Sequence, residues 1–307
     1  MARRIWVALL TLGLLTLSAA APAQKTNAPA AADEEETEDG VAWHPHFRRA
    51  GIWDAVAVGG ATTLILTESL LPRRSEALWK GPILLDEAIR DMFVLDSRHQ
   101  RAVASTVADV IFAGSLVQTM VVDNLILAWG LHGAPEVAFQ MSVANAEAYA
   151  FSTALTGWIK RLAGRARPYA AECERDHGYS AECGKSKGYR YRSFYSGHAA
   201  FTAVGAGLTC AHHLQLPLFN NRLLDAGYCA AGIGLTLATS AMRMAADKHW
   251  ATDVVVGHLV GFTSGYLIPT LFFYGLHRPG DRVDKRNTVW LPSIGPSSVG
   301  LQVIGRL

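Results

Sequence analysis

The sequence has 307 residues, of which 50% are hydrophobic and 18% are charged, and its formal net charge is +2. This composition excludes a disordered chain, a collagen-like chain and a small scaffold held by disulfides. The near-neutral charge argues against a nucleic-acid partner. The charge is uneven, however: residues 1–42 carry a net charge of −3 and residues 160–192 carry +5. The second stretch is therefore suited to an anionic partner.

The first residues have the three-part pattern of a secretory signal peptide. Two arginines precede an apolar run over residues 5–17, and Ala21-Pro22-Ala23 supplies a cleavage site with small residues. We expect a signal peptide over residues 1–23, with an uncleaved N-terminal anchor as the alternative. Residues 24–42 are rich in Ala, Pro and acidic residues without an apolar period, and this favours a disordered acidic linker.

Residues 43–287 are expected to form an all-α domain, a six-helix bundle. Six long apolar segments predict its helices, at 54–71, 103–131, 136–163, 197–216, 222–243 and 250–276. A shorter amphipathic helix is predicted near 84–95, with Leu84, Ile89 and Met92 on its apolar side and Asp86 on its polar side. The Pro- and Gly-containing residues 288–307 predict an extended C-terminal tail.

Composition alone does not decide whether these helices cross a membrane. Asp109, Asp123 and Glu147 interrupt the second and third segments, and acids inside a bilayer are costly. If a cleaved leader were followed by three crossing helices, Lys160 and the loop after it would lie inside the cell. A disulfide-bearing loop belongs outside. Either segment 54–71 does not cross, or the bundle does not span a membrane at all.

The four cysteines fall into two groups. Cys173 and Cys183 lie in a polar loop, where an oxidising compartment favours a disulfide. Metal ligation is the rival, but no CxxC pair or close His/Cys cluster supports it. Cys210 and Cys229 lie in apolar segments, where we expect buried free thiols.

The first of three clusters that carry chemistry runs from Lys160 to Pro168. Seven residues make nearly two helical turns, so Lys160 and Arg167 are expected on one helix face. Pro168 disfavours helical geometry before it, which places Arg167 at the helix end. Two cations there could bind an anion or merely interact with the helix dipole.

The second cluster is Ser196-Gly197-His198, at the predicted start of the fourth helix. Ser196 is a natural N-cap, and Gly197 lets a ligand approach the backbone closely. The free N–H groups of a helix start bind anions, and His198 would stand beside a bound anion. Taken alone, a serine cap followed by Gly-His is also common without any function.

The third cluster contains Arg243, His249 and Asp253. His249 and Asp253 are expected to be neighbours on the first turn of the last helix, where the carboxylate would fix the imidazole tautomer. Arg243 ends the preceding helix and offers a planar fork to phosphate oxygens. A His–Asp pair on a helix surface is the plainer interpretation of this cluster alone.

Antiparallel neighbours would bring all three clusters to one end of the bundle. In this order they resemble the signature of the type 2 phosphatidic acid phosphatase and vanadium haloperoxidase superfamily: Lys-x6-Arg-Pro, Pro-Ser-Gly-His and Ser-Arg-x5-His-x3-Asp. Every charged and imidazole position is filled, while Tyr195 replaces the Pro and Met242 replaces the Ser. The match runs from Lys160 to Asp253, and the expected leader suits an exported bacterial member.

The resemblance implies a metal-independent phosphatase with no cofactor. Five residues would hold the phosphate: Lys160, Arg167, Ser196, Gly197 and Arg243. By similarity, His249 would attack phosphorus and form a phosphohistidine, oriented by Asp253. His198 would protonate the leaving oxygen and later assist the attack of water.

We expect a phosphomonoester or diphosphate as substrate, and a lipid phosphate is favoured because apolar helices beside the site could admit its tail. A soluble periplasmic acid phosphatase is the alternative within this class. A vanadate-dependent haloperoxidase and a non-enzymatic anion-binding membrane protein are the alternatives outside it. The expected location is the cell envelope, either at the membrane with a periplasm-facing site or soluble in the periplasm.

The remaining histidines are expected to be structural. His44 and His46 flank a proline near the end of the linker and are assigned to a loop. His212 and His213 fall at the opposite end of the fourth helix from the predicted site. His258 follows Asp253 by little more than one helical turn and is expected inside the bundle.

Overall fold

The computed structural model describes residues 41–180, 182–184, 187–275, 288–295 and 298–305. The expected leader, and the expected linker up to residue 40, lie outside these residues. The helices follow in chain order: α2 (Ile52–Leu70), α3 (Asp86–Phe93), α4 (Arg98–Val117) with its π-helical continuation η2 (Gln118–Leu131), α5 (Pro135–Ala163), α6 (Tyr169–Arg175), the 3₁₀ turn η3 (Lys187–Tyr189), α7 (Gly197–Gln215), α8 (Arg222–Ala245), and α9 (Ala251–Pro269) with its π-helical continuation η4 (Thr270–Tyr274). Six long helices thus confirm the all-α class, and among the described elements the short α6 and η3 were not predicted.

The C-terminal tail forms two strands, in agreement with the extended structure expected there. Strands β1 (Thr288–Gly295) and β2 (Ser298–Gly305) pair antiparallel, with Thr288 opposite Gly305.

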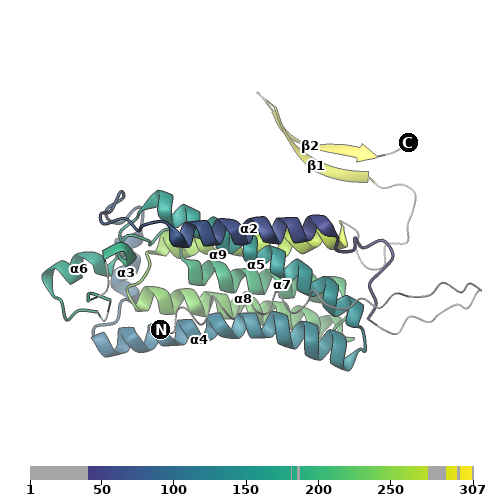
Figure 1. Cartoon of the computed structure of the whole chain (residues 1–307), viewed down its shortest axis with the longest axis horizontal. Helices are drawn as coiled ribbons and strands as arrows, with labels where there is room; N and C mark the ends of the chain where they lie inside the picture. The colour runs from purple at the N-terminus through teal and green to yellow at the C-terminus, as the bar shows by residue number, and fades with distance from the viewer. Residues whose placement is uncertain (1–40, 181, 185–186, 276–287, 296–297, 306–307) are drawn as a thin grey trace, which may run out of the picture. The chain divides into compact units, whose positions relative to one another are not determined.

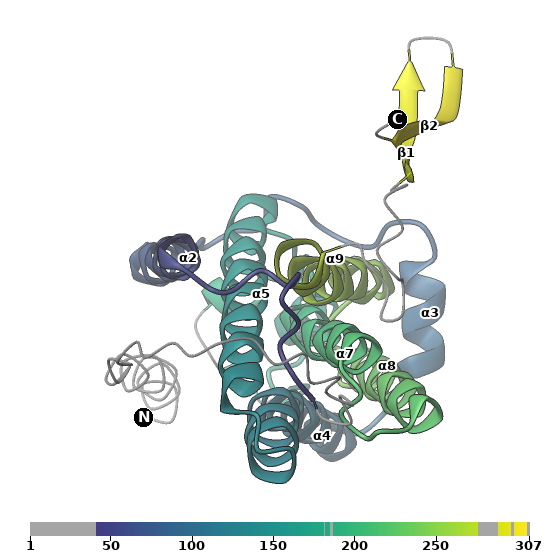
Figure 2. The ribbon, with the colours of Figure 1, turned by 90° about the vertical axis from the view of Figure 1, so that its right-hand side faces the viewer.

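Helix α7 is the centre of the bundle, and α4, α5, α8 and α9 all pack against it (Figure 2). Half of its buried residues are alanine or glycine, so neighbouring backbones approach closely. On α9, a Cβ added at Gly261 would lie 2.1 Å from the carbonyl oxygen of Ala200 in α7, and one added at Gly265 would lie 2.2 Å from that of Val204. These glycines are therefore required for the α7–α9 contact.

Successive long helices alternate in direction, as Figure 1 allows the reader to follow. At one end of the bundle, Leu95 before α4 donates its N–H to the oxygen of Ala245 in α8. At the same end Ser196, the N-cap of α7, donates its N–H to the oxygen of Asp253 in α9. We call this end, where α5 and α8 finish and α4, α7 and α9 begin, the site end, and the opposite one the far end. The expected convergence of the three clusters is confirmed.

Helix α2 packs along α5 and runs in the same direction (Figures 1 and 2). The N–H of Ala50 donates to Gln140 Oε1 at 2.7 Å near the far end. Near the site end, Arg161 Nε lies 3.7 Å from Glu68 Oε1. The two helices are thus in contact over most of their lengths.

The predicted amphipathic helix forms as α3, but most of its apolar side is exposed and Asp86 of its polar side is buried. Asp86, expected on the solvent side, is completely buried, whereas Leu84 is 90% exposed and Met92 is 73% exposed. The reason is that Asp86 has strong buried partners: it accepts from the Thr252 N–H at 2.8 Å and forms an ion pair with Arg165. A paired buried carboxylate outweighs the exposure of apolar side chains on so short a helix.

Two disulfides are present. Cys173 of α6 pairs with Cys183, and Cys210 of α7 pairs with Cys229 of α8. The expectation of free thiols at Cys210 and Cys229 is therefore wrong. These cysteines lie nearly equidistant from the short α7–α8 turn, so the antiparallel packing brings their Cα atoms to 4.5 Å.

Two helical segments are long and apolar enough to cross a membrane by length and composition. They are Arg98–Leu131, with a mean hydropathy of 1.7, and Ala251–Tyr274, with a mean hydropathy of 1.4. Large apolar side chains are exposed along several helices: Trp53, Leu70, Val110, Trp129, Leu131, Leu223, Leu237, Val255, Leu259 and Phe272. The interior, in contrast, is rich in alanine and in buried Ser, Thr, Asn and His.

Candidate active site

Lys160 lies on the last turn of α5, as predicted, but the helix ends before Arg167. Gly164 caps α5 in the left-handed conformation, with φ of 51°. The expectation that Lys160 and Arg167 share a helix face is therefore wrong. They meet through the chain before α7 instead: the Lys160 ammonium donates to the oxygen of Arg192 at 3.1 Å, and the Arg167 guanidinium donates to the same oxygen at 3.4 Å.

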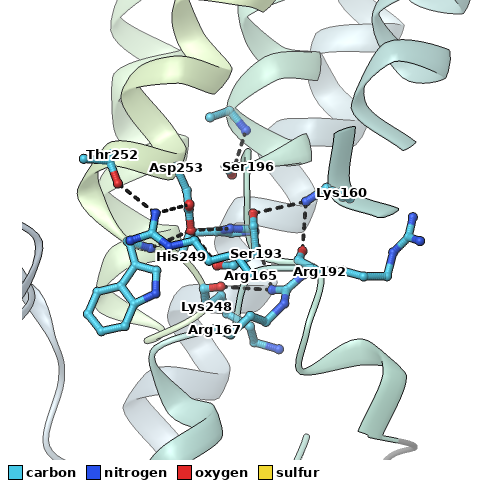
Figure 3. A network of polar contacts seen from close by, with 12 residues as sticks. Lys160, Arg165, Arg167, Arg192, Ser193, Ser196, Lys248, His249, Thr252 and Asp253 are labelled. Atoms are coloured by element: carbon cyan, nitrogen blue, oxygen red, sulfur yellow. Dashed lines mark hydrogen bonds and ion pairs between the residues drawn. The ribbon is translucent and has the colours of Figure 1, made fainter. Parts of the chain in front are cut away.

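The Arg167 side chain is held by backbone oxygens. Its Nε donates to the oxygen of Tyr189 at 3.2 Å, and its NH1 donates to that of Lys248 at 3.0 Å. The same NH1 lies 3.5 Å from His249 Nε2. The cation therefore stands directly beside the imidazole nitrogen expected to act as nucleophile (Figure 3).

His249 precedes α9, and Asp253 lies at its third position because Trp250 is the N-cap. The expected placement of His249 on the first turn is thus off by two residues. The pair is nevertheless close: His249 Nδ1 lies 3.6 Å from Asp253 Oδ2, and both side chains are almost completely buried. Since Nδ1 has no hydrogen-bond partner among the described residues, a shift of a few tenths of an ångström toward Asp253 would form the expected bond.

Asp253 is held by two groups that the sequence interpretation did not single out. Arg165 is completely buried and donates to Asp253 Oδ1 at 2.7 Å, and the Ser193 hydroxyl donates to Oδ2. Arg165 also pairs with Asp86 and stacks on Trp79, with its guanidinium 4.0 Å from the ring centre. The spacing Lys160–Arg165–Arg167 could have flagged Arg165, but no local pattern indicates which arginine faces Asp253.

Ser196 caps α7 as predicted. It is buried and accepts from the Ala199 N–H at 3.4 Å. A Cβ added at Gly197 would lie 3.5 Å from Lys160 Cε, an ordinary contact, so the surrounding protein does not itself demand glycine there. The helix start therefore lies beside the Lys160 side chain, where its N–H groups and the ammonium can bind one anion.

His198 and Arg243 meet at a carboxylate on α4. His198 Nε2 lies 2.7 Å from Asp109 Oδ1, and Arg243 NH1 lies 3.5 Å from the same oxygen. Asp109 was noted in the sequence only as an acid interrupting an apolar segment. Its distance in sequence from the three clusters hid its place beside both His198 and Arg243.

The cations surround both histidines closely enough to change their acidity. Burial, followed by the charges of Arg167, Lys160 and Arg243, holds the pKa of His249 well below its usual value. His249 is therefore neutral at neutral pH, as a nucleophile must be. Burial and Arg243 also lower the pKa of His198 to about 4, against the opposing effect of Asp109. A bound phosphate dianion would offset those cations and favour the protonated form of His198.

The two departures from the signature fill packing positions. The buried Tyr195 has its hydroxyl 3.2 Å from Thr156 Oγ1. Met242 packs against Ala104 and Ala245, between α4 and the end of α8. Neither side chain replaces a charged or imidazole group.

The other histidines lie away from these residues. His212 is buried between Tyr274 and Asn145, and His258 lies within 3.0 Å of the Thr236 oxygen. His44 and His46 lie before α2 in the chain segment that packs near Phe47. Among the described residues, no three His, Cys, Asp or Glu side chains are grouped so that they could hold a metal ion.

The geometry thus gathers the residues of all three clusters at the site end. A comparison with protein-family models matches residues 143–276 to the PAP2 superfamily. Comparisons with curated proteins and with solved structures gave no match. The matched region contains every residue from Lys160 to Asp253, and this match supports the type 2 phosphatidic acid phosphatase superfamily.

Proposed function

We propose that this protein hydrolyses a lipid phosphate, either a monoester or a diphosphate, through a phosphohistidine on His249. Phosphoester hydrolysis in general follows from the superfamily. The observation that carries the finer proposal is the position of a buried, neutral imidazole with Arg167 3.5 Å from Nε2 and a carboxylate near Nδ1. A nucleophile, its orienting group and a charge-neutralising cation are therefore contiguous.

In the first step, the lone pair of His249 Nε2 attacks phosphorus and the bond to the leaving oxygen breaks. Asp253 stabilises the imidazolium that forms, while the cations of Lys160, Arg167 and Arg243 stabilise the phosphoryl oxygens. His198 donates its proton to the leaving oxygen. In the second step a water attacks phosphorus, His198 takes the proton of that water, and the phosphorus–nitrogen bond breaks to release phosphate.

The apolar exterior supports the lipid part of the proposal. Exposed Trp53, Leu70, Val110, Val255 and Leu259 are large side chains that a soluble bundle would bury. The small residues between α7 and α9 are typical of helix contacts in membranes. We therefore place the bundle at a membrane, where the tail of a lipid phosphate can lie against the helices while its head group reaches the site.

The alternating helices constrain the orientation. If all six long helices cross the membrane, the site end lies on the opposite side from residues 41–51. Since α2 packs along α5 in the same direction, crossing by α5 without α2 is disfavoured. A cleaved leader, crossing by all six helices and a periplasm-facing site therefore cannot all be true together. N-terminal sequencing of the mature protein, with salt and detergent fractionation of membranes, would identify which of them fails.

The function is tested by phosphate release from purified protein without added metal, on phosphatidate, an isoprenyl diphosphate and p-nitrophenyl phosphate. We expect turnover of a lipid substrate that vanadate inhibits. We expect His249→Ala to abolish this turnover. Activity that survives His249→Ala would contradict the mechanism. Hydrolysis of p-nitrophenyl phosphate alone would instead favour the soluble acid phosphatase, and bromide oxidation on adding vanadate would favour a haloperoxidase.

A further inference from the structure

A pocket lined by cations lies next to Lys160, outside the group of residues around His249. Its lining consists of Arg73, Arg74, Lys160, Arg161, Tyr191 and Arg192, and it opens to the surface. The residues come from three parts of the chain: the loop after α2, the end of α5 and the segment before α7. Four of the five cations have no role in the proposed reaction.

The positive charge of this pocket is only partly neutralised. Glu68, at the end of α2, contacts the side chains of Arg192 and Arg161. Arg74 uses its Nε to donate to the oxygen of Arg161 at 3.1 Å. Within the described residues, Glu68 is the one carboxylate that forms an ion pair with Arg161 or Arg192. Arg74, Arg161, Arg192 and Lys160 outnumber this one carboxylate, and such a group of cations favours an anion beside it.

The pocket is connected to the catalytic residues through Lys160. Its ammonium donates to the oxygens of Arg192 and Ser193 and approaches the start of α7, so it borders both regions. In the view of Figure 3 the Arg192 side chain extends away from His249, beyond Lys160. A group bound by Arg74, Arg161 and Arg192 would therefore lie beside a phosphate bound at His249 without replacing it.

We propose that this basic pocket is a second anion subsite, which binds a phosphate group other than the one that is cleaved. This inference rests on the proposed function for the identity of its neighbour. The chemistry of the pocket fits the non-reacting phosphate of a diphosphate substrate, and equally the phosphate of an adjacent lipid head group. Arginine guanidinium groups suit both, because their planar forks pair with phosphate oxygens.

Binding of non-hydrolysable ligands tests the subsite without turnover. Arg74 is exposed and outside the catalytic residues, so Arg74→Gln and Arg74→Glu should fold. By calorimetry, we expect Arg74→Gln to weaken methylenediphosphonate about tenfold, the effect of one lost charge-assisted hydrogen bond, and Arg74→Glu to weaken it further. The affinity of either variant for methylphosphonate should change less than about twofold. Arg222→Glu, at the exposed start of α8, is the matched control and should leave the affinity for both phosphonates unchanged.

Turnover then distinguishes the two sources of the phosphate. If it belongs to the substrate, Arg74→Glu should lower kcat/KM for an isoprenyl diphosphate and spare the monophosphate with the same tail. If it belongs to a neighbouring lipid, the variant should abolish activation of monophosphate hydrolysis by phosphatidylglycerol in the micelle. Equal weakening of both phosphonates, or of neither, would overturn the subsite. If the Arg74 variants weakened binding of methylenediphosphonate selectively but the protein had no phosphatase activity, the proposed function would be wrong and the subsite would be supported.

Discussion

The two ends of the bundle each bury a His–Asp pair, yet their surroundings are opposite. At the far end, His213 Nδ1 lies 2.6 Å from Asp225, and its Nε2 faces a second carboxylate, Asp123, at 3.6 Å. In the described part of the chain, no lysine or arginine forms an ion pair with Asp123 or Asp225. At the site end, His249 and Asp253 are 3.6 Å apart and the imidazole lies among three cations.

This contrast shows that a buried His–Asp pair is not by itself a phosphatase site. The far-end pair has the shorter contact, and judged by pair geometry alone it would be the better candidate. A phosphate dianion, however, needs cations that replace its hydration, and a site lined by carboxylates repels it. The electrostatic surroundings of the pair therefore decide which histidine can be a phosphoryl acceptor.

The largest difference between the ends is expected from matched carboxylate variants. Asp253→Asn should lower kcat by roughly 10²- to 10⁴-fold, because an amide in place of the carboxylate neither fixes the productive tautomer nor stabilises the imidazolium. Asp225→Asn breaks an equally buried pair and should leave kcat within about twofold. The measurement is phosphate release at saturating substrate, with thermal denaturation of each variant. If kcat fell in proportion to Tm in both variants, the two His–Asp pairs would not differ in function.

A smaller difference is expected from arginines on the same helix, α8. Arg243→Lys keeps the charge but loses the planar fork, and should lower kcat/KM by about 10- to 100-fold because transition-state oxygens lose a paired donor. Arg222→Lys, at the far end of α8, should have no measurable effect. Steady-state kinetics on p-nitrophenyl phosphate or the lipid substrate would show this. An unchanged Arg243→Lys would mean that Arg243 serves only to hold Asp109.

The sequence was sufficient for the helices and for the residues that the motifs name. Apolar periodicity located the six long helices to within a few residues, and the alternation of their ends predicted where Lys160, His198 and His249 meet. What it missed depends on contacts between distant segments. Asp86, Arg165 and Asp109 are charged residues whose burial or pairing is decided by partners up to 166 positions away, as in the hydrogen bond from the Thr252 N–H to Asp86.

Helix α3 and the second disulfide were also predicted wrongly because contacts between distant segments decide them. The amphipathic pattern of α3 predicted a buried apolar face, but the ion pair with Arg165 holds Asp86 in the interior while Leu84 and Met92 stay exposed. The Cys210–Cys229 disulfide was also missed, because each cysteine was judged by its own apolar surroundings. The register of α7 against α8 makes that bond, and register is a property of the packed pair of helices.

The two disulfides offer a further test, since one lies at each end. Arg190 donates to the oxygen of Cys183, and Arg167 donates its N–H to the oxygen of Arg190 at 2.8 Å. Replacing Cys173 and Cys183 by serine should therefore loosen Arg167 and lower kcat/KM about three- to tenfold. The Cys210→Ser/Cys229→Ser variant should lower Tm, in keeping with a loss of about 2–4 kcal/mol, and spare kcat/KM. Equal kinetic effects of the two double variants would contradict this assignment.

The smallest expected effect concerns Lys248, a cation of the site end. No described lysine or arginine forms an ion pair with the far-end carboxylates Asp123 and Asp225. Lys248 lies between α8 and α9, with its ammonium 2.8 Å from Glu182 Oε1. Burial, together with Arg243, lowers the pKa of Lys248 to about 8. The ammonium is therefore charged below that pH and becomes neutral above it. Because a phosphate monoester is already a dianion above about pH 6, the substrate charge stays constant over this range.

We therefore expect kcat/KM to fall about two- to fivefold as pH rises through 8, since one nearby positive charge is lost. Lys248→Gln should start from the lower value and lack this fall. Glu182→Gln removes the carboxylate that raises the pKa of Lys248, so the fall should move to lower pH. A pH profile from 6.5 to 9.5 on p-nitrophenyl phosphate distinguishes the three proteins. If kcat/KM fell at the same alkaline pH in all three proteins, the fall would arise from another group. Lys248 would then make no contribution to anion binding at the site end.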